Sequence, residues 1–193
     1  MKIHKNVLSP ETLSRCIYDL GYFRDKAVWK NSGLFWHEDV RVGTTGIVTQ
    51  TLVSVDISKL LDAELDKYFY EYKKDLKMIE YQFFVWNALS GISTHNDSMY
   101  RFGATLYLNP VWKMDWGGTF LWKDKNEEDY CKWNALCPEQ NMLVINDEKE
   151  FHLVSSISPH AAEERYSIQI WGVPEDISPG SGVTLREIKA SNN

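Results

Sequence analysis

The chain has 193 residues, a length that suits a single globular domain with one sizeable hydrophobic core. Hydrophobic residues make up 44% and charged residues 25% of the chain, which excludes a disordered, collagen-like or membrane-bundle protein. The formal net charge of −6 would repel a phosphate backbone, so we expect no nucleic-acid partner.

Two helices are predicted in the first third of the chain. The run Ser9-Pro10-Glu11 combines a capping side chain, a proline at the first helical position and an acid in the first turn. We expect this helix to end at Gly21, and its apolar residues recur at helical spacing, at Leu13, Ile17 and Leu20. A second helix is predicted to start at Asp56-Ile57-Ser58, and its apolar face consists of Leu60, Leu61, Leu65, Phe69 and Tyr72.

Short β-rich segments follow one another from residue 81 onward, separated by glycine, proline and asparagine turns. The predicted strands cover residues 47–55, 81–86, 102–108, 119–122, 142–145 and 165–171. Many short strands after N-terminal helices favour an all-β barrel or sandwich with helices packed outside it. We expect one domain over residues 1–193, with helical support and first strands in 1–80, the β core in 81–172 and a turn-rich tail in 173–193.

The last of these strands alternates between polar and apolar residues. Arg165, Ser167 and Gln169 fall on one face, opposite Tyr166, Ile168 and Ile170. The polar face could simply meet solvent, as in many antiparallel sheets. Alternatively, it lines a barrel that holds an anionic ligand, with Arg165 as the bidentate partner of that ligand.

The run His95-Asn96-Asp97 places an imidazole and a carboxylate two residues apart, so that both can leave the same face of an extended segment. A third ligand from His152 would complete two histidines and one carboxylate, the facial triad of non-haem Fe(II) oxygenases. A second tripeptide of this kind, His37-Glu38-Asp39, has little preceding sequence that could form supporting strands. We therefore interpret His37 and Asp39 as surface or loop residues.

Residues from about 81 to 172, half of the chain, resemble the 2-oxoglutarate/Fe(II)-dependent dioxygenases, most closely their small prolyl-4-hydroxylase-like branch. The resemblance rests on five short segments in the family's order: His95-Asn96-Asp97, residues 106–112, residues 116–120, His152-Leu153-Val154, and Arg165-Tyr166-Ser167 followed by Trp171. It implies a double-stranded β-helix, or jelly roll, with the N-terminal helices packed on its major sheet.

The resemblance also implies roles for individual residues. Iron would be held by His95, Asp97 and His152, and the distal carboxylate of 2-oxoglutarate by Arg165, with contacts from Ser167 and Tyr107 and a weaker candidate in Gln169. Ascorbate is a candidate reductant. The chain departs from the family at Trp86, where a tyrosine is common. The side chain differs in chemistry, because a tryptophan offers only a donor N–H. His160 competes with His152 as the distal ligand, but only four residues separate it from Arg165, so we favour His152.

The implied activity is hydroxylation of a C–H bond, with a prolyl or other residue of a peptide or protein as the expected substrate and small molecules still open. An aromatic groove for a peptide could form from Trp29, Trp36, Trp112 and Trp116, although each tryptophan also suits core or loop packing. A segment around residues 29–45 is a candidate lid over the substrate.

Two other classes share features with this pattern. A jelly-roll module that binds a sugar or a structural metal would not need two histidines, an aspartate and Arg165 on one lining, and a structural zinc site usually has four protein ligands. A zinc-dependent hydrolase fits the triad alone, but does not explain the pair Arg165 and Ser167.

Cysteines and apolar runs favour a cytoplasmic protein without membrane contact. The three cysteines, Cys16, Cys131 and Cys137, form no paired framework and no CxxC pattern, which favours reduced thiols. Residues 83–86 and 142–145 are the longest apolar runs, far shorter than a membrane span, and the first residues lack an apolar signal core.

Overall fold

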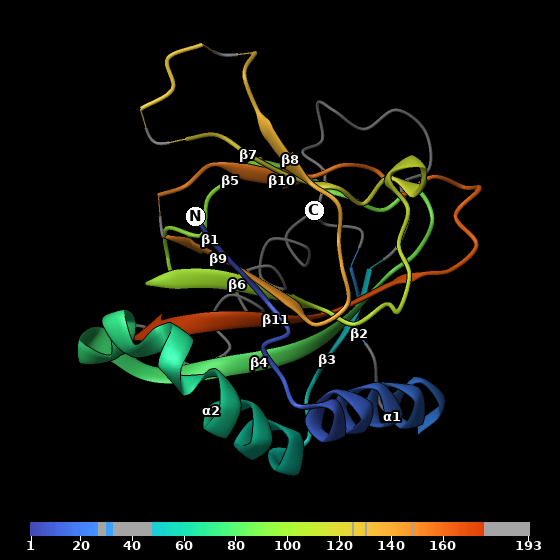
Figure 1. Cartoon of the computed structure of the whole chain (residues 1–193), viewed down its shortest axis with the longest axis vertical. Helices are drawn as coiled ribbons and strands as arrows, with labels where there is room; N and C mark the ends of the chain where they lie inside the picture. Colours follow the sequence, from blue (N-terminus) through green and yellow to red (C-terminus); the bar gives the residue numbers. More distant parts are fainter. Residues whose placement is uncertain (27–29, 33–47, 125, 130, 148, 176–193) are drawn as a thin grey trace, which may run out of the picture.

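Two antiparallel β-sheets face each other, and two α-helices cover the outer face of the larger sheet (Figure 1). The computed structural model describes residues 1–26, 30–32, 48–124, 126–129, 131–147 and 149–175. The mainly β architecture with helices outside the major sheet is the one expected from the sequence, and the jelly-roll prediction is confirmed.

The larger sheet has seven strands in the order β1-β9-β6-β11-β4-β3-β2. In that order the strands are Lys2–Lys5, Met142–Asp147, Phe102–Tyr107, Arg165–Pro174, Leu76–Trp86, Val48–Leu52 and Lys30–Ser32. The smaller sheet has the order β5-β10-β7-β8, formed by Ile92–His95, His152–Val154, Phe120–Trp122 and Asn134–Leu136. Each of the six predicted strand segments overlaps one of these strands, and β4, β9 and β11 extend beyond the predicted bounds. The last strand continues to Pro174, beyond the expected start of the tail at residue 173.

Helix α1 (Pro10–Lys26) begins after Ser9, whose hydroxyl accepts a hydrogen bond from the Thr12 backbone N–H at 3.2 Å. The prediction that Gly21 ends this helix is wrong. A single helical glycine costs only about 0.5–1 kcal/mol relative to alanine. Phe23 packs on the hydrophobic core after that position and helps to offset this cost.

Helix α2 (Val55–Phe69) begins after Ser54, whose hydroxyl accepts from the Ile57 backbone N–H at 3.3 Å. Its buried face consists of Ile57, Leu61, Leu65 and Phe69. Short 3₁₀ turns follow at Tyr70–Asp75 and later at Met114–Trp116. Neither α-helix in the described part of the chain has the length and apolar character needed to cross a membrane.

Strand alternation divides the core into two clusters, one on each side of the larger sheet. The outer cluster packs the helices against side chains such as Phe83, Ile168 and Ile170. The inner cluster fills the space between the sheets and includes Phe84, Trp86, Tyr107, Phe120 and Val154. The polar face of β11 points into this inner space, so the alternative of a solvent-facing polar strand is excluded: Arg165 and Ser167 have no exposed surface.

Candidate metal centre

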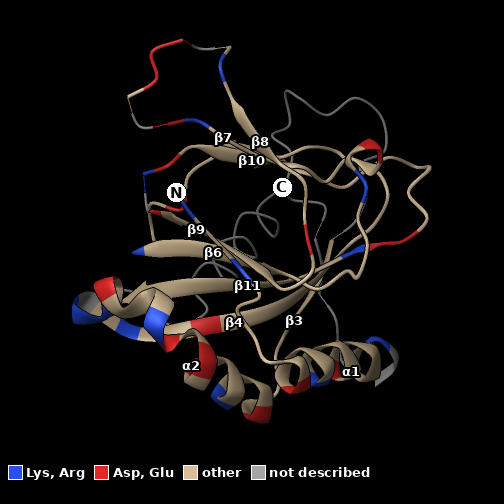
Figure 2. Ribbon diagram, in the orientation of Figure 1, with Lys and Arg blue, Asp and Glu red and all other residues tan. Residues whose placement is uncertain are grey.

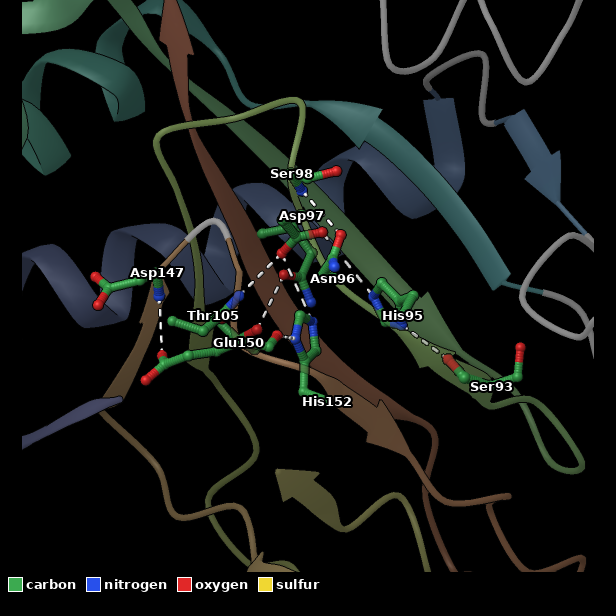
Figure 3. A network of polar contacts seen from close by, with 11 residues as sticks. Ser93, His95, Asn96, Asp97, Ser98, Thr105, Asp147, Glu150 and His152 are labelled. Carbon is green, nitrogen blue, oxygen red and sulfur yellow. Dashed lines mark hydrogen bonds and ion pairs between the residues drawn. The ribbon is translucent and has the colours of Figure 1, made fainter. Parts of the chain in front are cut away.

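Two histidines and one aspartate converge between the sheets (Figure 3). His95 ends β5, Asp97 lies in the following loop, and His152 begins β10. Strands β5 and β10 are neighbours, and the register places His152 directly opposite His95. One possible ligand atom from each of the three residues lies within 4.8 Å of the others, a spacing that can hold a metal ion.

Backbone carbonyl groups orient both imidazole rings. His95 Nδ1 lies 2.8 Å from the Ser93 carbonyl oxygen, and His152 Nδ1 lies 2.9 Å from the Glu150 carbonyl oxygen. A carbonyl oxygen can only accept, so each Nδ1 is the protonated nitrogen, and each Nε2 carries the lone pair. The Nε2 atoms face Asp97, at 3.9 Å for His95 and 3.6 Å for His152.

The Asp97 carboxylate is fixed by two residues of neighbouring strands. Asn146 on β9 donates a hydrogen bond from Nδ2 to Asp97 Oδ2 at 3.0 Å. Gly103 on β6 leaves the necessary room, because a Cβ atom at that position would lie 2.1 Å from the same oxygen. Asn96 accepts instead from the Ser98 backbone N–H at 3.3 Å, in the turn that carries Asp97 inward.

Arg165 lies deeper between the sheets and is fully buried. Its guanidinium carbon lies 5.1 Å from the ring centroid of Trp86 and 4.9 Å from that of Tyr107. Within the described residues, all three guanidinium nitrogens and the Tyr107 hydroxyl are buried without a hydrogen-bond partner. A buried cation with no partner is costly, so this arrangement calls for an anion with several acceptor oxygens.

The charge at Arg165 persists in this environment. Burial lowers the pKa of Arg165, and the nearby Tyr107 opposes that shift. The guanidinium still stays protonated at neutral pH, because the ordinary pKa of arginine lies far above it. Burial also raises the pKa of Tyr107, which therefore remains a neutral hydroxyl able to donate a hydrogen bond to an anion.

Trp86, the position that departs from the family pattern, has a definite contact. Its indole Nε1–H donates to the Ser167 hydroxyl at 3.3 Å, across the β4–β11 pair. This bond leaves the Ser167 proton available for a second partner.

A cavity adjoins the three converging residues and is lined by side chains of both sheets. Its polar lining includes Gln169 and Thr105, which are joined by a hydrogen bond from Thr105 Oγ1 to Gln169 Oε1 at 2.9 Å. Phe84, Phe120 and Trp171 supply aromatic walls.

Other residues considered from the sequence lie elsewhere. His160 is exposed in a turn outside the converging group. Trp112 is buried, its indole donates to the Gly117 carbonyl oxygen at 2.8 Å, and its ring packs edge-on against Trp116. The remaining candidates, His37, Asp39, Trp29 and Trp36, lie outside the described residues, as does most of the expected lid at 29–45.

The donor set decides which groups fit this site. Two imidazoles and one carboxylate, with open positions on the other side, suit Fe(II). The unpartnered guanidinium and hydroxyl groups suit a carboxylate of an organic acid. The histidines and the aspartate therefore fit iron, and the guanidinium and hydroxyl groups fit a dicarboxylate co-substrate.

Comparisons with known proteins agree with this chemistry. Residues 82–172 match the family described as the 2OG-Fe(II) oxygenase superfamily. No curated protein sequence matches the chain significantly.

Solved structures show the same fold. A prolyl-4-hydroxylase from Pseudomonas putida superposes with a TM-score of 0.70 at 15% identity, over 90% of this chain and 92% of that one. A prolyl hydroxylase from Trichoplax adhaerens, in complex with a hypoxia inducible factor peptide fragment, superposes with a TM-score of 0.69 at 18% identity. The match covers 90% of this chain and 83% of that one. The non-heme alpha ketoglutarate dependent epimerase SnoN from nogalamycin biosynthesis superposes with a TM-score of 0.65 at 11% identity. The match covers 93% of this chain and 85% of that one. The matched residues include the whole converging group and Arg165, and they identify this stretch of the chain as a 2OG-Fe(II) oxygenase, a class of enzymes that use Fe(II) and 2-oxoglutarate.

Proposed function

We propose that this enzyme hydroxylates a C–H bond of a prolyl residue in a peptide or protein. In this proposal Fe(II) is held by His95, Asp97 and His152, and the distal carboxylate of 2-oxoglutarate by Arg165. Ser167 and Tyr107 donate further hydrogen bonds to the same carboxylate.

The observation that carries the assignment of 2-oxoglutarate is the unpartnered Arg165 guanidinium. Its three nitrogens and the Tyr107 hydroxyl lie buried without an acceptor among the described residues. A planar carboxylate can accept two parallel bonds from two of the guanidinium nitrogens and one from each of the Tyr107 and Ser167 hydroxyls, which satisfies most of these donors. A zinc-dependent hydrolase would need the metal group but would leave Arg165 unexplained.

The residues of this chain would act by positioning. The bonds from the two Nδ1 atoms to backbone carbonyls hold both Nε2 lone pairs toward the metal position, and Asn146 orients the carboxylate of Asp97. The cavity beside the group is walled by Phe84, Phe120 and Trp171, which exclude bulk water from the reacting C–H bond. When bound, iron and 2-oxoglutarate supply the oxidation, with dioxygen consumed, the co-substrate converted to succinate and CO2, and one oxygen atom passed to the substrate.

A peptide substrate is supported by the fold comparison and by the site. Prolyl hydroxylases are among the structures that share this fold, and one of them was solved with a peptide fragment. The cavity is walled by aromatic residues, which pack well against a pyrrolidine ring.

The test uses iron-loaded enzyme with 2-oxoglutarate, air and a library of proline-containing peptides, each paired with a peptide that has alanine in place of proline. Mass spectrometry should find one added oxygen on proline peptides, matched by an equal amount of succinate. Oxygen addition that does not depend on proline would refute the prolyl assignment while retaining the hydroxylase. Succinate formation stimulated by small metabolites, and by no peptide, would refute a peptide substrate.

A further inference from the structure

The inner face of β4 carries two buried polar side chains that the proposed chemistry does not use. Alternation along this strand puts Glu80 and Gln82 on the same face as Phe84 and Trp86, the face that looks between the sheets. Only 8% of Glu80 and 3% of Gln82 is exposed. Gln82 donates from Nε2 to Glu80 Oε1 at 2.6 Å.

This pair offers more acceptor than donor capacity to a further partner. Gln82 directs one N–H of its amide to Glu80, and its carbonyl oxygen is an acceptor on the same side chain as that donor. Among the described residues, no basic side chain forms an ion pair with Glu80. A buried carboxylate bonded to a single neutral amide is poorly compensated, so a cation is the partner that this position favours.

The register connects this pair to the metal group. Gln82 lies opposite Gln169 and Glu80 lies opposite Trp171, and both partners line the cavity beside the metal group. Trp171 in turn lies opposite Gly103, the residue that makes room for Asp97. Two strand spacings therefore separate the backbone of Glu80 from that of Gly103, about 10 Å.

Aromatic rings adjoin the same position. The Trp171 ring centroid lies 5.8 Å from that of Phe84 and 5.8 Å from that of Tyr100. Glu80 lies opposite Trp171 on the neighbouring strand, and a carboxylate near an indole is a favourable combination for a guanidinium or ammonium group, which gains both a charged hydrogen bond and a cation–π contact. The net charge of −6 also attracts a basic substrate over longer distances.

We propose that Glu80 and Gln82, together with Trp171, form a cation-binding subsite that selects peptide substrates with an arginine or lysine near the hydroxylated residue. This inference rests on the proposed function, since it concerns the substrate of the same site. An extended chain advances about 3.4 Å per residue, so a span of about 10 Å places the basic residue within about three positions of the hydroxylated one.

The direct test compares two probes of almost the same shape, N-acetyl-argininamide and N-acetyl-citrullinamide, which differ in charge. Their binding to the iron- and 2-oxoglutarate-loaded enzyme is measured by NMR titration without oxygen, and formation of the iron–2-oxoglutarate complex is recorded on the same samples. The arginine probe should bind about tenfold more tightly, as expected for one hydrogen-bonded charge pair. Equal affinities, or no saturable binding of the arginine probe at millimolar concentration, would overturn the proposal without the need for any variant.

The variant Glu80→Gln removes the charge and preserves the size of the side chain. It should reduce the preference for the arginine probe to about equality, whereas the matched change Glu11→Gln, on exposed α1, should leave it unchanged. A preference that survives in Glu80→Gln would assign cation binding to another group.

Two outcomes separate this inference from the proposed function. If the complex of iron and 2-oxoglutarate forms but the enzyme does not discriminate between the two probes, only the subsite is refuted. Failure of that complex to form refutes the proposed function, and arginine preference would then still support a cation site.

A second arm uses the peptide substrates. Replacement of arginine by citrulline within three positions of the target should lower kcat/KM about tenfold in the wild type and have little effect in Glu80→Gln. The same replacement at distant positions should have little effect in both proteins. A loss that is the same at every position, or that persists in Glu80→Gln, would contradict the subsite.

Discussion

Arg165 carries a full positive charge into the interior, and its three nitrogens have no hydrogen-bond partner within the described residues. The rings of Trp86 and Tyr107 lie close to the guanidinium but accept no hydrogen bond from it. The guanidinium therefore lacks hydrogen-bond acceptors until an anion binds, as expected for a residue that binds an anionic co-substrate.

Arg165→Lys should raise the KM for 2-oxoglutarate about 10- to 100-fold, because an ammonium group cannot make two parallel bonds to one carboxylate. Steady-state kinetics with varied 2-oxoglutarate measure this effect. Arg15→Lys, at an exposed position on α1, serves as the matched control and should leave the KM unchanged. An unchanged KM in Arg165→Lys would place the co-substrate elsewhere.

Gly103→Ala should weaken Fe(II) binding about 10- to 100-fold, because the new methyl group would occupy the place of the Asp97 carboxylate. Gly21→Ala is the matched control, since a Cβ at that position would meet nothing within 4 Å apart from its chain neighbours and the backbone of its own helix. It should retain iron affinity and stabilise the fold by about 0.5–1 kcal/mol. Equilibrium dialysis of Fe(II) without oxygen measures both proteins, and equal affinities would mean that Asp97 does not hold the metal.

Sequence patterns point to candidate site residues that form local runs or alternate along a strand, and the roles of these residues stay predictions. His95, Asp97, His152 and Arg165 were found in this way, and the structure brings the first three together. Asn146 and Gly103 were missed because their contacts with Asp97 cross from β9 and β6 into a distant loop, and nothing in their local sequence marks such contacts.

At the scale of elements, helices α1 and α2 are joined by one carboxylate. Glu64 on α2 accepts hydrogen bonds from the backbone N–H and hydroxyl of Ser9, at 2.6 and 2.7 Å, and from the Thr12 hydroxyl. Burial raises the pKa of Glu64, but the bonds from Thr12 and Ser9 lower it by more, so its pKa lies below the ordinary value. The charged form therefore stabilises the folded state above the unfolded-state pKa, and this stabilisation is lost as the pH falls through the folded-state pKa.

Glu64→Gln should lower the free energy of unfolding at pH 7 by about 1 kcal/mol, because a neutral amide accepts these bonds less strongly than a carboxylate does. The difference from the wild type should shrink as the pH falls below the ordinary value of 4.5. Urea unfolding followed by circular dichroism at several pH values measures it. Glu139→Gln, which breaks an exposed ion pair with Lys5, should change stability by less than about 0.5 kcal/mol. A pH-independent loss in Glu64→Gln would show that the charge of Glu64 is not involved.

Elements with a long apolar or alternating pattern were predicted, whereas most of the shortest, with the exception of β7, were not. Strands β1, β5, β8 and β10 have only three or four residues each, too few for a period of two to stand out from chance. Pairing with neighbours, not local propensity, makes these segments strands, as in the register between His152 and both His95 and Trp122.

The whole molecule brings the site together from both sheets. The smaller sheet supplies His95 and His152, the larger sheet supplies Arg165 and Tyr107, and the two helices stiffen the larger sheet from outside (Figure 1). Lys, Arg, Asp and Glu gather on the helices and on the loop between β7 and β8 (Figure 2). The apolar inner cluster therefore surrounds a small number of polar groups, among them the unpartnered Arg165 guanidinium and Tyr107 hydroxyl.

The central claim is that the three converging residues hold iron with 2-oxoglutarate bound beside it. The most direct measurement is an anaerobic titration of the protein with Fe(II) and 2-oxoglutarate, followed by the weak visible charge-transfer band of the chelated complex, in wild type, His152→Ala and His160→Ala. We expect the band in the wild type and in His160→Ala, whose substitution lies in an exposed turn, and no band in His152→Ala. A wild-type protein that binds iron but gives no band, or a band that survives in His152→Ala and disappears in His160→Ala, would contradict the account.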